Sequence, residues 1–181
     1  EADATADSVL AQMDKCAETS WMMNMGSDKG ILIEKVIAQR RPKRLLEIGT
    51  FLGYMSIRLA RSMPQDASLT TIEIDADNYA ASRRIRAKAL GKRDDSVIAL
   101  KANASEALKT LKGPFDFVLM DHWKPDYARD LESLRKAGLL ADKCMVVADN
   151  VPSAMDMEGS TTPLMTGCSF ATCSVLPSTA N

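Results

Sequence analysis

Acidic and amide side chains stand at the ends of several short apolar runs in this chain of 181 residues. Glu47 and Glu73 close two of these runs, Asp121 closes a third, and Asp149 with Asn150 closes a fourth. A single acid in such a place is most simply a turn residue. Four carboxylates gathered at one edge of a sheet would repel one another, which implies bound cations or a ligand rich in hydroxyl groups. The pattern therefore favours a binding site.

Three of these residues carry the oxygen atoms that a hard metal ion prefers. Asp121, Asp149 and Asn150 offer two carboxylates and an amide, and no Cys or second His accompanies them, which disfavours zinc. Few oxygen donors favour Mg²⁺, whose octahedron is completed by water and substrate. The alternative interpretation is that all three side chains cap turns.

A glycine-containing turn follows the first apolar run. Its glycines, Gly49 and Gly53, are spaced GxxxG rather than GxGxxG, so the dinucleotide fingerprint is absent and a nicotinamide dehydrogenase is disfavoured. Gly49 can let the backbone approach a ligand closely, and Gly53 can begin a helix. Glu73 stands about 20 residues beyond, where nucleotide sites of α/β proteins place the acid that binds ribose hydroxyls. Together these residues suggest an adenosine-type ligand without a pyrophosphate, such as S-adenosylmethionine.

Short apolar runs alternate with longer amphipathic segments, and this order predicts the elements that position the site. The predicted strands are 44–49, 69–74, 97–102, 115–121 and 144–149. The predicted helices are 6–19, 29–39, 54–63, 77–90, 105–112 and 127–137. Strands and helices at this spacing indicate an α/β fold with βαβ units, right-handed crossovers and a parallel sheet covered on both faces. Ligands bind outside the carboxyl ends of such strands, where the acids stand.

Composition excludes several classes of protein. The chain has 23 Lys and Arg against 24 Asp and Glu, and this balance argues against a nucleic-acid partner. No apolar run approaches the ~18 residues of a membrane-spanning helix. The four cysteines form no CxxC pair, which favours a reducing compartment, and we expect a cytoplasmic protein. The sequence begins at Glu1, so a signal or anchor upstream stays an open alternative.

Four segments resemble catechol O-methyltransferases in the order and spacing of that family, over roughly residues 7 to 151. They are residues 20–30, residues 46–54, Met-Asp-His-Trp-Lys at 120–124 and Ala-Asp-Asn-Val at 148–151. The last two are highly specific. The resemblance implies a Rossmann-like, class I methyltransferase that uses S-adenosylmethionine and Mg²⁺ to methylate a catechol or related phenol.

The resemblance also implies roles by position. Asp121, Asp149 and Asn150 would hold Mg²⁺, and Lys124 would accept the proton of the attacking hydroxyl. A lysine is an unusual base at its ordinary pKa near ~10.4, but a nearby Mg²⁺ and partial burial would lower that pKa.

Further residues would contact the methyl donor and the substrate. The implied contacts to S-adenosylmethionine are Met25, Glu47, Gly49, Tyr54, Glu73, Ile74, Ser105, Asp121 and His122. The implied contacts to the substrate are Trp21, Met23, Trp123, Lys124 and Asn150. Within the first set, Ser105 and His122 belong to the adenine side, and Met25, Glu47, Gly49 and Tyr54 to the methionine end.

The chain departs from the family pattern at two places. Met55 stands where the family usually has Ser, with Ser56 one place later. Residues 1–150 form the predicted donor- and metal-binding domain, and 151–181 form an atypical tail, rich in Ser, Thr and Pro, of the same domain. The tail contains one predicted strand, within 167–176. It has no counterpart of the family's final strand. The Glu that binds substrate in the family also has no counterpart, because the matching residues 175–180 read Val-Leu-Pro-Ser-Thr-Ala.

The missing strand predicts an incomplete sheet. The 144–149 strand would then have an uncovered edge, which either 167–176 folds back to cover or a second molecule meets by strand pairing. The altered tail also leaves a second functional hypothesis, a regulatory domain that binds S-adenosylmethionine but has lost turnover.

Overall fold

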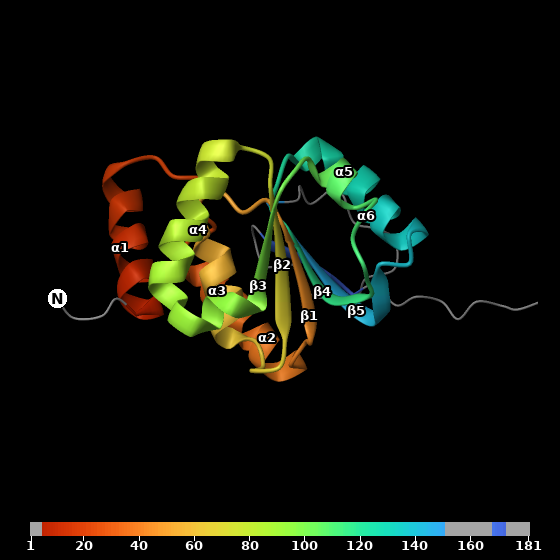
Figure 1. Ribbon diagram of the computed structural model, residues 1–181, viewed down its shortest axis with the longest axis horizontal. Coiled ribbons are helices and arrows are strands. Elements are labelled where there is room, and N and C mark those ends of the chain that lie inside the picture. The colour runs from red at the N-terminus through yellow and green to blue at the C-terminus, as the bar shows by residue number, and fades with distance from the viewer. Residues whose placement is uncertain (1–4, 151–167, 173–181) are drawn as a thin grey trace, which may run out of the picture.

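The computed structural model describes residues 5–150 and 168–172. Its helices are α1 (Ala6–Thr19), α2 (Ser27–Arg40), α3 (Tyr54–Ser62), α4 (Ala76–Leu90), α5 (Ala104–Ala107) and α6 (Tyr127–Lys136), with 3-10 turns η1 (Gly91–Ser96) and η2 (Lys124–Asp126). Its strands are β1 (Arg44–Ile48), β2 (Ser68–Glu73), β3 (Val97–Lys101), β4 (Phe115–Met120), β5 (Leu140–Asp149) and β6 (Cys168–Thr172). Figure 1 shows the order of these elements around one sheet.

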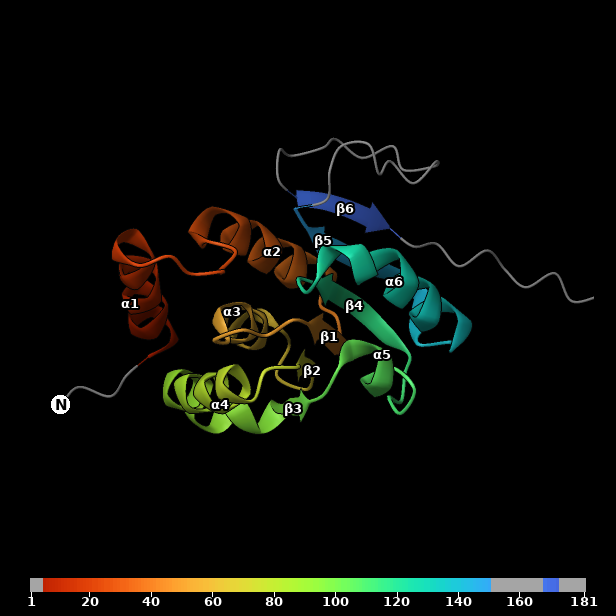
Figure 2. The same ribbon diagram turned by 90° about the horizontal axis from the view of Figure 1, so that it is seen from above.

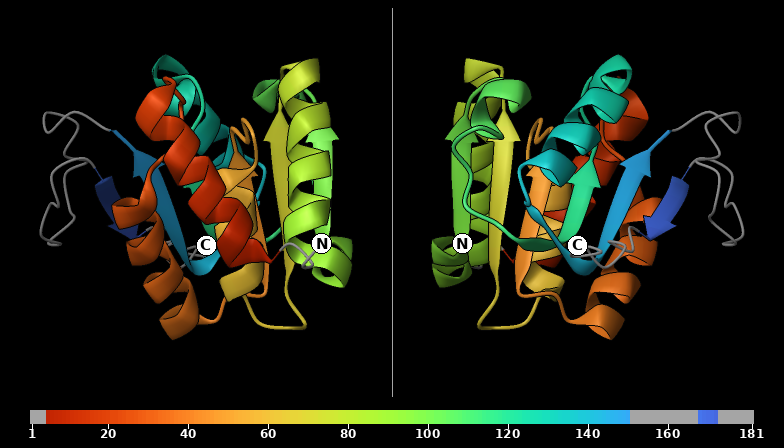
Figure 3. Two further views of the ribbon diagram at one scale, coloured as in Figure 1. Left: turned by 90° about the vertical axis from the view of Figure 1, so that its left-hand side faces the viewer. Right: turned by 90° about the vertical axis from the view of Figure 1, so that its right-hand side faces the viewer.

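The sheet has the order β3-β2-β1-β4-β5-β6. β1 to β5 pair in parallel, and β6 is antiparallel to β5. In Figure 3 the arrowheads of the parallel strands point the same way and that of β6 points the opposite way. The strand order reverses between the neighbouring strands β1 and β4, because the chain continues from β1 to β2 on one side and from β4 to β5 on the other. An open α/β sheet forms its ligand crevice at such a point.

Two hydrophobic cores, one on each face of the sheet, hold the helices in place. Leu45 and Phe117 pack with the core that includes α1, α2, α3 and α4. Their neighbours Leu46 and Val118 pack with the other core, which includes α5 and α6. Successive strand residues point to opposite faces, so a strand buried on both sides is apolar at most of its positions rather than at every second one. Figure 2 shows the sheet between these two layers of helices, and the predicted α/β class is confirmed.

Two predicted elements differ from the structure by more than two residues at one end. The predicted helix 105–112 is reduced to α5, because the amides of Lys109 and Thr110 bond three residues back and the chain turns toward β4. β5 begins at Leu140 rather than 144, and it runs through the charged pair Asp142 and Lys143. The first part of β5 is irregular, as the register shift between β4 and β5 and the positive φ of Lys143 show. The pattern of apolar and polar residues therefore does not predict where this strand begins.

Of the two outcomes predicted for the edge of β5, the structure shows the first, in which part of the 167–176 segment folds back and covers the edge. Within the described residues, β6 pairs with β5 from Met145 opposite Thr172 to Asp149 opposite Cys168. These main-chain bonds satisfy the groups that we expected to recruit a second molecule, so the argument for self-association through this edge loses its premise. The tail residues 151–167 and 173–181, with the 175–180 segment, lie outside the described residues.

No described helix is both long and apolar enough to cross a membrane.

Candidate active site

The carboxyl ends of the strands open into a cavity of about 820 Å³. Almost all of the predicted site residues line it: Trp21, Met23, Met25, Glu47, Gly49, Tyr54, Glu73, Ile74, Asp121, His122, Trp123, Lys124, Asp149 and Asn150. A second hollow, of about 340 Å³ over α4, contains none of them. The cavity at the strand ends is therefore the candidate site.

Ser105 is the predicted residue that does not line this cavity. Its amide and its hydroxyl both donate to the side-chain oxygen of Asn103, at 2.9 and 2.8 Å, where Asn103 caps α5. Asn103 and Ala104 line the cavity instead. The Asn immediately before the helix is the signal that sequence reasoning missed, since a capping Asn commonly engages the following amides.

The turn after β1 is held by Glu73 at the end of β2. One carboxylate oxygen accepts from the amides of Thr50 and Phe51 at 3.2 and 2.7 Å, and the other accepts from the amide of Asp75 at 2.8 Å. Gly49 is required by geometry, because its φ is +92° and a Cβ there would lie 2.3 Å from the carbonyl oxygen of Asp121. Glu73 thus fixes the shape of the turn, whatever else it binds.

Glu47 is buried at the floor of the cavity. Its Oε2 accepts from the Ser56 hydroxyl, whereas its Oε1 is buried without a hydrogen-bond partner among the described residues. Burial raises the pKa of Glu47 to about 8, and the nearby Asp121 adds to the rise. An unpaired buried acceptor is costly unless a ligand donates to it. Ser56, rather than Met55, therefore makes the polar contact next to this acid, and Met55 lines the cavity.

A second unpartnered atom belongs to His122, which lines the same cavity. Its Nε2 lies 2.9 Å from Asp130 Oδ2, so we assign the ring proton to Nε2. Burial lowers the pKa of His122, which favours the neutral ring. Nδ1 is then an acceptor, and it is buried with no partner among the described residues.

Asp121 and Asp149 form the acidic part of the site, next to Asn150. Burial, reinforced by the charge of Asp149, raises the pKa of Asp121 to about 7, and the nearby Lys124 and Lys29 oppose this rise. Lys29 Nζ lies 2.7 Å from Asp149 Oδ1 and 2.7 Å from Asn150 Oδ1. These oxygens therefore accept a cationic partner in the structure. Sequence reasoning gave Lys29 no role, because its contacts span 120 residues of chain.

The donor set fits a hard divalent cation, although acids alone would not suffice. In the part of the chain that the structure describes, no group of three or more His, Cys, Asp or Glu side chains is placed to hold a metal. The amide oxygen of Asn150 would be the third protein ligand beside Asp121 and Asp149. An incomplete oxygen set of this kind is typical of Mg²⁺, which retains waters.

Three large apolar side chains stand at the mouth of the cavity. Trp21, Trp123 and Met23 are 84%, 71% and 57% exposed. They come from separate segments, the link between α1 and α2 and the loop after β4. Exposed aromatic residues around a cavity are suited to contact a flat apolar ligand.

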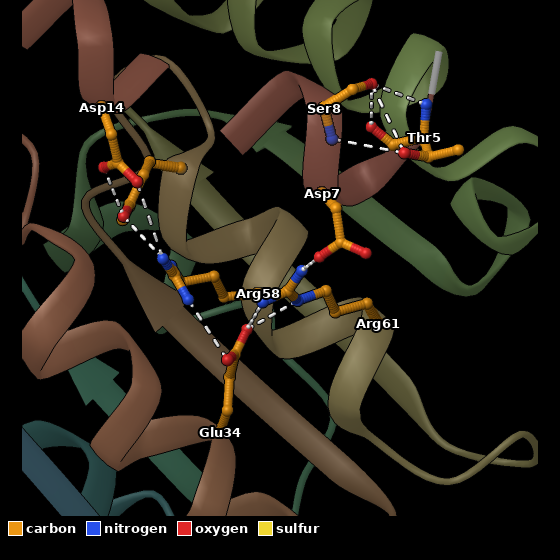
Figure 4. Close-up of polar contacts among 8 residues, drawn as sticks. Thr5, Asp7, Ser8, Asp14, Glu34, Arg58 and Arg61 are labelled. Atoms are coloured by element: carbon orange, nitrogen blue, oxygen red, sulfur yellow. Dashed lines mark hydrogen bonds and ion pairs between the residues drawn. The ribbon is translucent and has the colours of Figure 1, made fainter. Parts of the chain in front are cut away.

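Helices α1, α2 and α3 are joined by a polar cluster beside the cavity (Figure 4). The Tyr54 hydroxyl donates to Asp14 at 2.7 Å and accepts from Arg58 at 2.8 Å. Burial raises the pKa of Tyr54 to about 12, so the phenol keeps its proton. Arg58 also pairs with Glu34 at 3.2 Å. Because the ring of Tyr54 lines the cavity, this cluster ties the cavity wall to α1 and α2.

Comparisons with known sequences place the chain among methyltransferases. A family model described as O-methyltransferase matches residues 1–158. The chain is 37% identical to a catechol O-methyltransferase of Mus musculus and 33% identical to catechol O-methyltransferase B of Danio rerio, each over 150 residues. Both alignments cover 80% of this chain and 56% of the relative, so the chain spans little more than half of their length. A probable O-methyltransferase of Mycobacterium tuberculosis is 37% identical and covered to 65%.

Solved structures agree with the fold. The O-methyltransferase TomG from Streptomyces achromogenes, in complex with SAM, matches with a TM-score of 0.70 and 30% identity over 78% of this chain and 65% of TomG. The SAH-bound Podospora anserina methyltransferase PaMTH1 matches with a TM-score of 0.72 and 27% identity over 78% of this chain and 62% of PaMTH1. The Rossmann-like fold and the resemblance to catechol O-methyltransferases are confirmed.

Proposed function

We propose that this chain, which belongs to the O-methyltransferase family, transfers a methyl group from S-adenosylmethionine to a hydroxyl of a catechol-type phenol in a Mg²⁺-dependent reaction. The observation that carries the proposal is the cavity that collects an acidic oxygen cluster, a lysine and an aromatic rim at the strand ends. The roles of individual residues below are part of the proposal.

The unpartnered buried atoms support the donor site. The positive charge of the amino group at the methionine end would favour the ionised form of Glu47, whose Oε1 would then accept from that group, and His122 Nδ1 would accept on the adenine side. The two residues belong to the ends of β1 and β4, which are neighbours in the sheet. Glu73 accepts three hydrogen bonds from backbone amides, and its carboxylate has further lone pairs that would accept from the ribose hydroxyls.

Asp121, Asp149 and Asn150 are the residues that would hold Mg²⁺. When bound, the ion would supply Lewis acidity that lowers the pKa of the substrate hydroxyl and fixes its oxygen. Methyl transfer is an in-line displacement, so the protein gains most by aligning the reactants and excluding water. Trp21, Met23 and Trp123 would position the ring and shield it.

Lys124 would take the proton from the attacking hydroxyl. It lies on η2 at the cavity, and its charge is close enough to lower the pKa of Asp121. As a residue of the same cavity as the acids, Lys124 would be placed to accept a proton from a hydroxyl bound there.

A second candidate function is a regulatory domain that binds S-adenosylmethionine without turnover. It rests on the tail sequence, which lacks the family's substrate-binding Glu. The acids and Lys124 gathered in one cavity favour the enzyme, since a binding domain has no need of them.

Incubation with labelled S-adenosylmethionine and a simple catechol, with Mg²⁺ or with EDTA, tests the proposal. We expect methylated catechol with Mg²⁺ and none with EDTA. Product that is insensitive to chelation would refute the metal role of Asp121, Asp149 and Asn150. Donor binding without product would support the regulatory domain instead.

A further inference from the structure

The ammonium of Lys29 occupies a defined place between two of the proposed metal ligands. Its Nζ lies 2.7 Å from Asp149 Oδ1 and 2.7 Å from Asn150 Oδ1. The side chain of Asp149 is 5% exposed and that of Lys29 25% exposed, so the pair is largely shielded from water. A charge pair with this little access to water is screened far less than a surface pair.

The helix that carries Lys29 is fixed against its neighbour. Gly30, the next residue of α2, lies so close to Arg58 that a Cβ there would be 2.5 Å from its Nε. One turn further along, Glu34 pairs with Arg58 and Arg61 of α3. The fully buried Ile33 anchors the same helix in the core. Lys29 is therefore aimed at the end of β5 by the packing of α2, and not by chance contact of a mobile surface chain.

The acids at this point need a cation. Asp121 and Asp149 lie close enough for each charge to disfavour the other, and both lie at the same edge of the sheet. Lys29 supplies one positive charge from α2, and Lys124 supplies another from η2. Without Lys29, the buried carboxylate of Asp149 would lose a charged partner, which is costly for a buried ion.

We propose that Lys29 is a built-in counter-cation that holds Asp149 and Asn150 in the metal-free protein and withdraws when a divalent cation binds. Metal binding is then an exchange of one cation for another at the same oxygens. This inference rests on the metal site of the proposed function. Lys29 would then have two effects on that site. It keeps the ligand side chains ordered when no metal is bound, and it lowers the affinity for the metal because it competes for the same oxygens.

Direct metal titration separates this role from a purely structural one. Mn²⁺ replaces Mg²⁺ as the probe, and the free ion is counted by electron paramagnetic resonance in wild type, Lys29→Met, Lys29→Arg and Lys35→Met. Loss of a displaced charged contact is worth roughly a factor of ten in affinity. We expect Lys29→Met to bind Mn²⁺ about tenfold more tightly and Lys29→Arg to resemble wild type. Lys35 is exposed on the same helix, so Lys35→Met controls for the lost charge and should bind like wild type.

Thermal unfolding in EDTA gives a second readout. We expect Lys29→Met to unfold about 3–6 °C below wild type without metal, and saturating Mg²⁺ to remove the difference. Equal or weaker Mn²⁺ binding by Lys29→Met overturns the exchange proposal. Asp149→Asn distinguishes failure of the Lys29 proposal from failure of the proposed metal site. If Asp149→Asn abolishes Mn²⁺ binding while Lys29→Met leaves it unchanged, only the role of Lys29 is refuted. If no protein in the set binds Mn²⁺, the metal site of the proposed function falls as well.

Discussion

Replacing Glu47 with Gln should change how the stability of the protein depends on pH. The native carboxyl keeps its proton up to about pH 8, whereas the ordinary value is 4.5. Between these values the native state binds more protons than the unfolded state, so the free energy of unfolding falls as pH rises. The stabilising contribution is complete below the unfolded pKa and is lost as pH rises toward the folded pKa. The amide introduced by Glu47→Gln cannot ionise and can still accept from Ser56, so the variant lacks this loss.

The size of the effect follows from the proton count. One proton corresponds to about 1.4 kcal/mol per pH unit, so wild type should lose roughly 3 kcal/mol relative to Glu47→Gln between about pH 5 and pH 7.5. Urea unfolding at several pH values, without S-adenosylmethionine, measures this difference. Glu18→Gln, at an exposed position of α1, should reproduce the wild-type slope. Parallel stability profiles for wild type and Glu47→Gln would refute the burial argument.

Three other substitutions test the site. Lys124→Ala should lower kcat by ~10²-fold or more while calorimetry finds donor affinity unchanged, and normal turnover would mean that the proton goes elsewhere. Glu73→Ala should weaken S-adenosylmethionine binding about tenfold or more, because it strands the amides of the β1 turn; a change in kcat alone would contradict this. Gly49→Ala should cost more than about 2 kcal/mol in chemical unfolding, whereas Gly53→Ala, whose Cβ would lie 3.3 Å from that of Ser82, should cost less. Equal costs would contradict the assigned clash with Asp121.

The strand ends were predictable from the sequence because each parallel strand is buried on both faces. That burial makes the strand a mostly apolar run, and an acid stands at its end or directly after it, as at Glu73 and Asp121. The same rule failed at the start of β5, where Asp142 lies inside the strand because the sheet is irregular there. The cavity could be predicted for the same reason as the strand ends, since ligand sites follow them.

The remaining features depend on contacts between distant parts of the chain. Nothing local in the sequence says that Lys29 reaches Asp149, because the packing of α2 on α3 decides it. The pairing of β6 with β5 was open for a similar reason, since a short apolar segment in a Ser- and Thr-rich tail carries no register of its own. Ser105 was expected at the cavity, but its side chain is engaged by Asn103, which caps α5.

The attachment of α1 has two ends with different sensitivity to ionic strength. At its start, Asp7 pairs with Arg61, and the side chain of Asp7 is 89% exposed. Further along, Asp14 binds the Tyr54 hydroxyl, next to the buried Arg58. Added salt screens the exposed pair more strongly than the contacts of Asp14, which is 34% exposed beside an Arg58 that is 4% exposed. Rising salt should therefore loosen the contact of the first turn of α1 with α3 before it affects the Asp14 contacts next to the cavity residue Tyr54, so the N-terminal end of α1 and the wall of the donor site respond to salt separately.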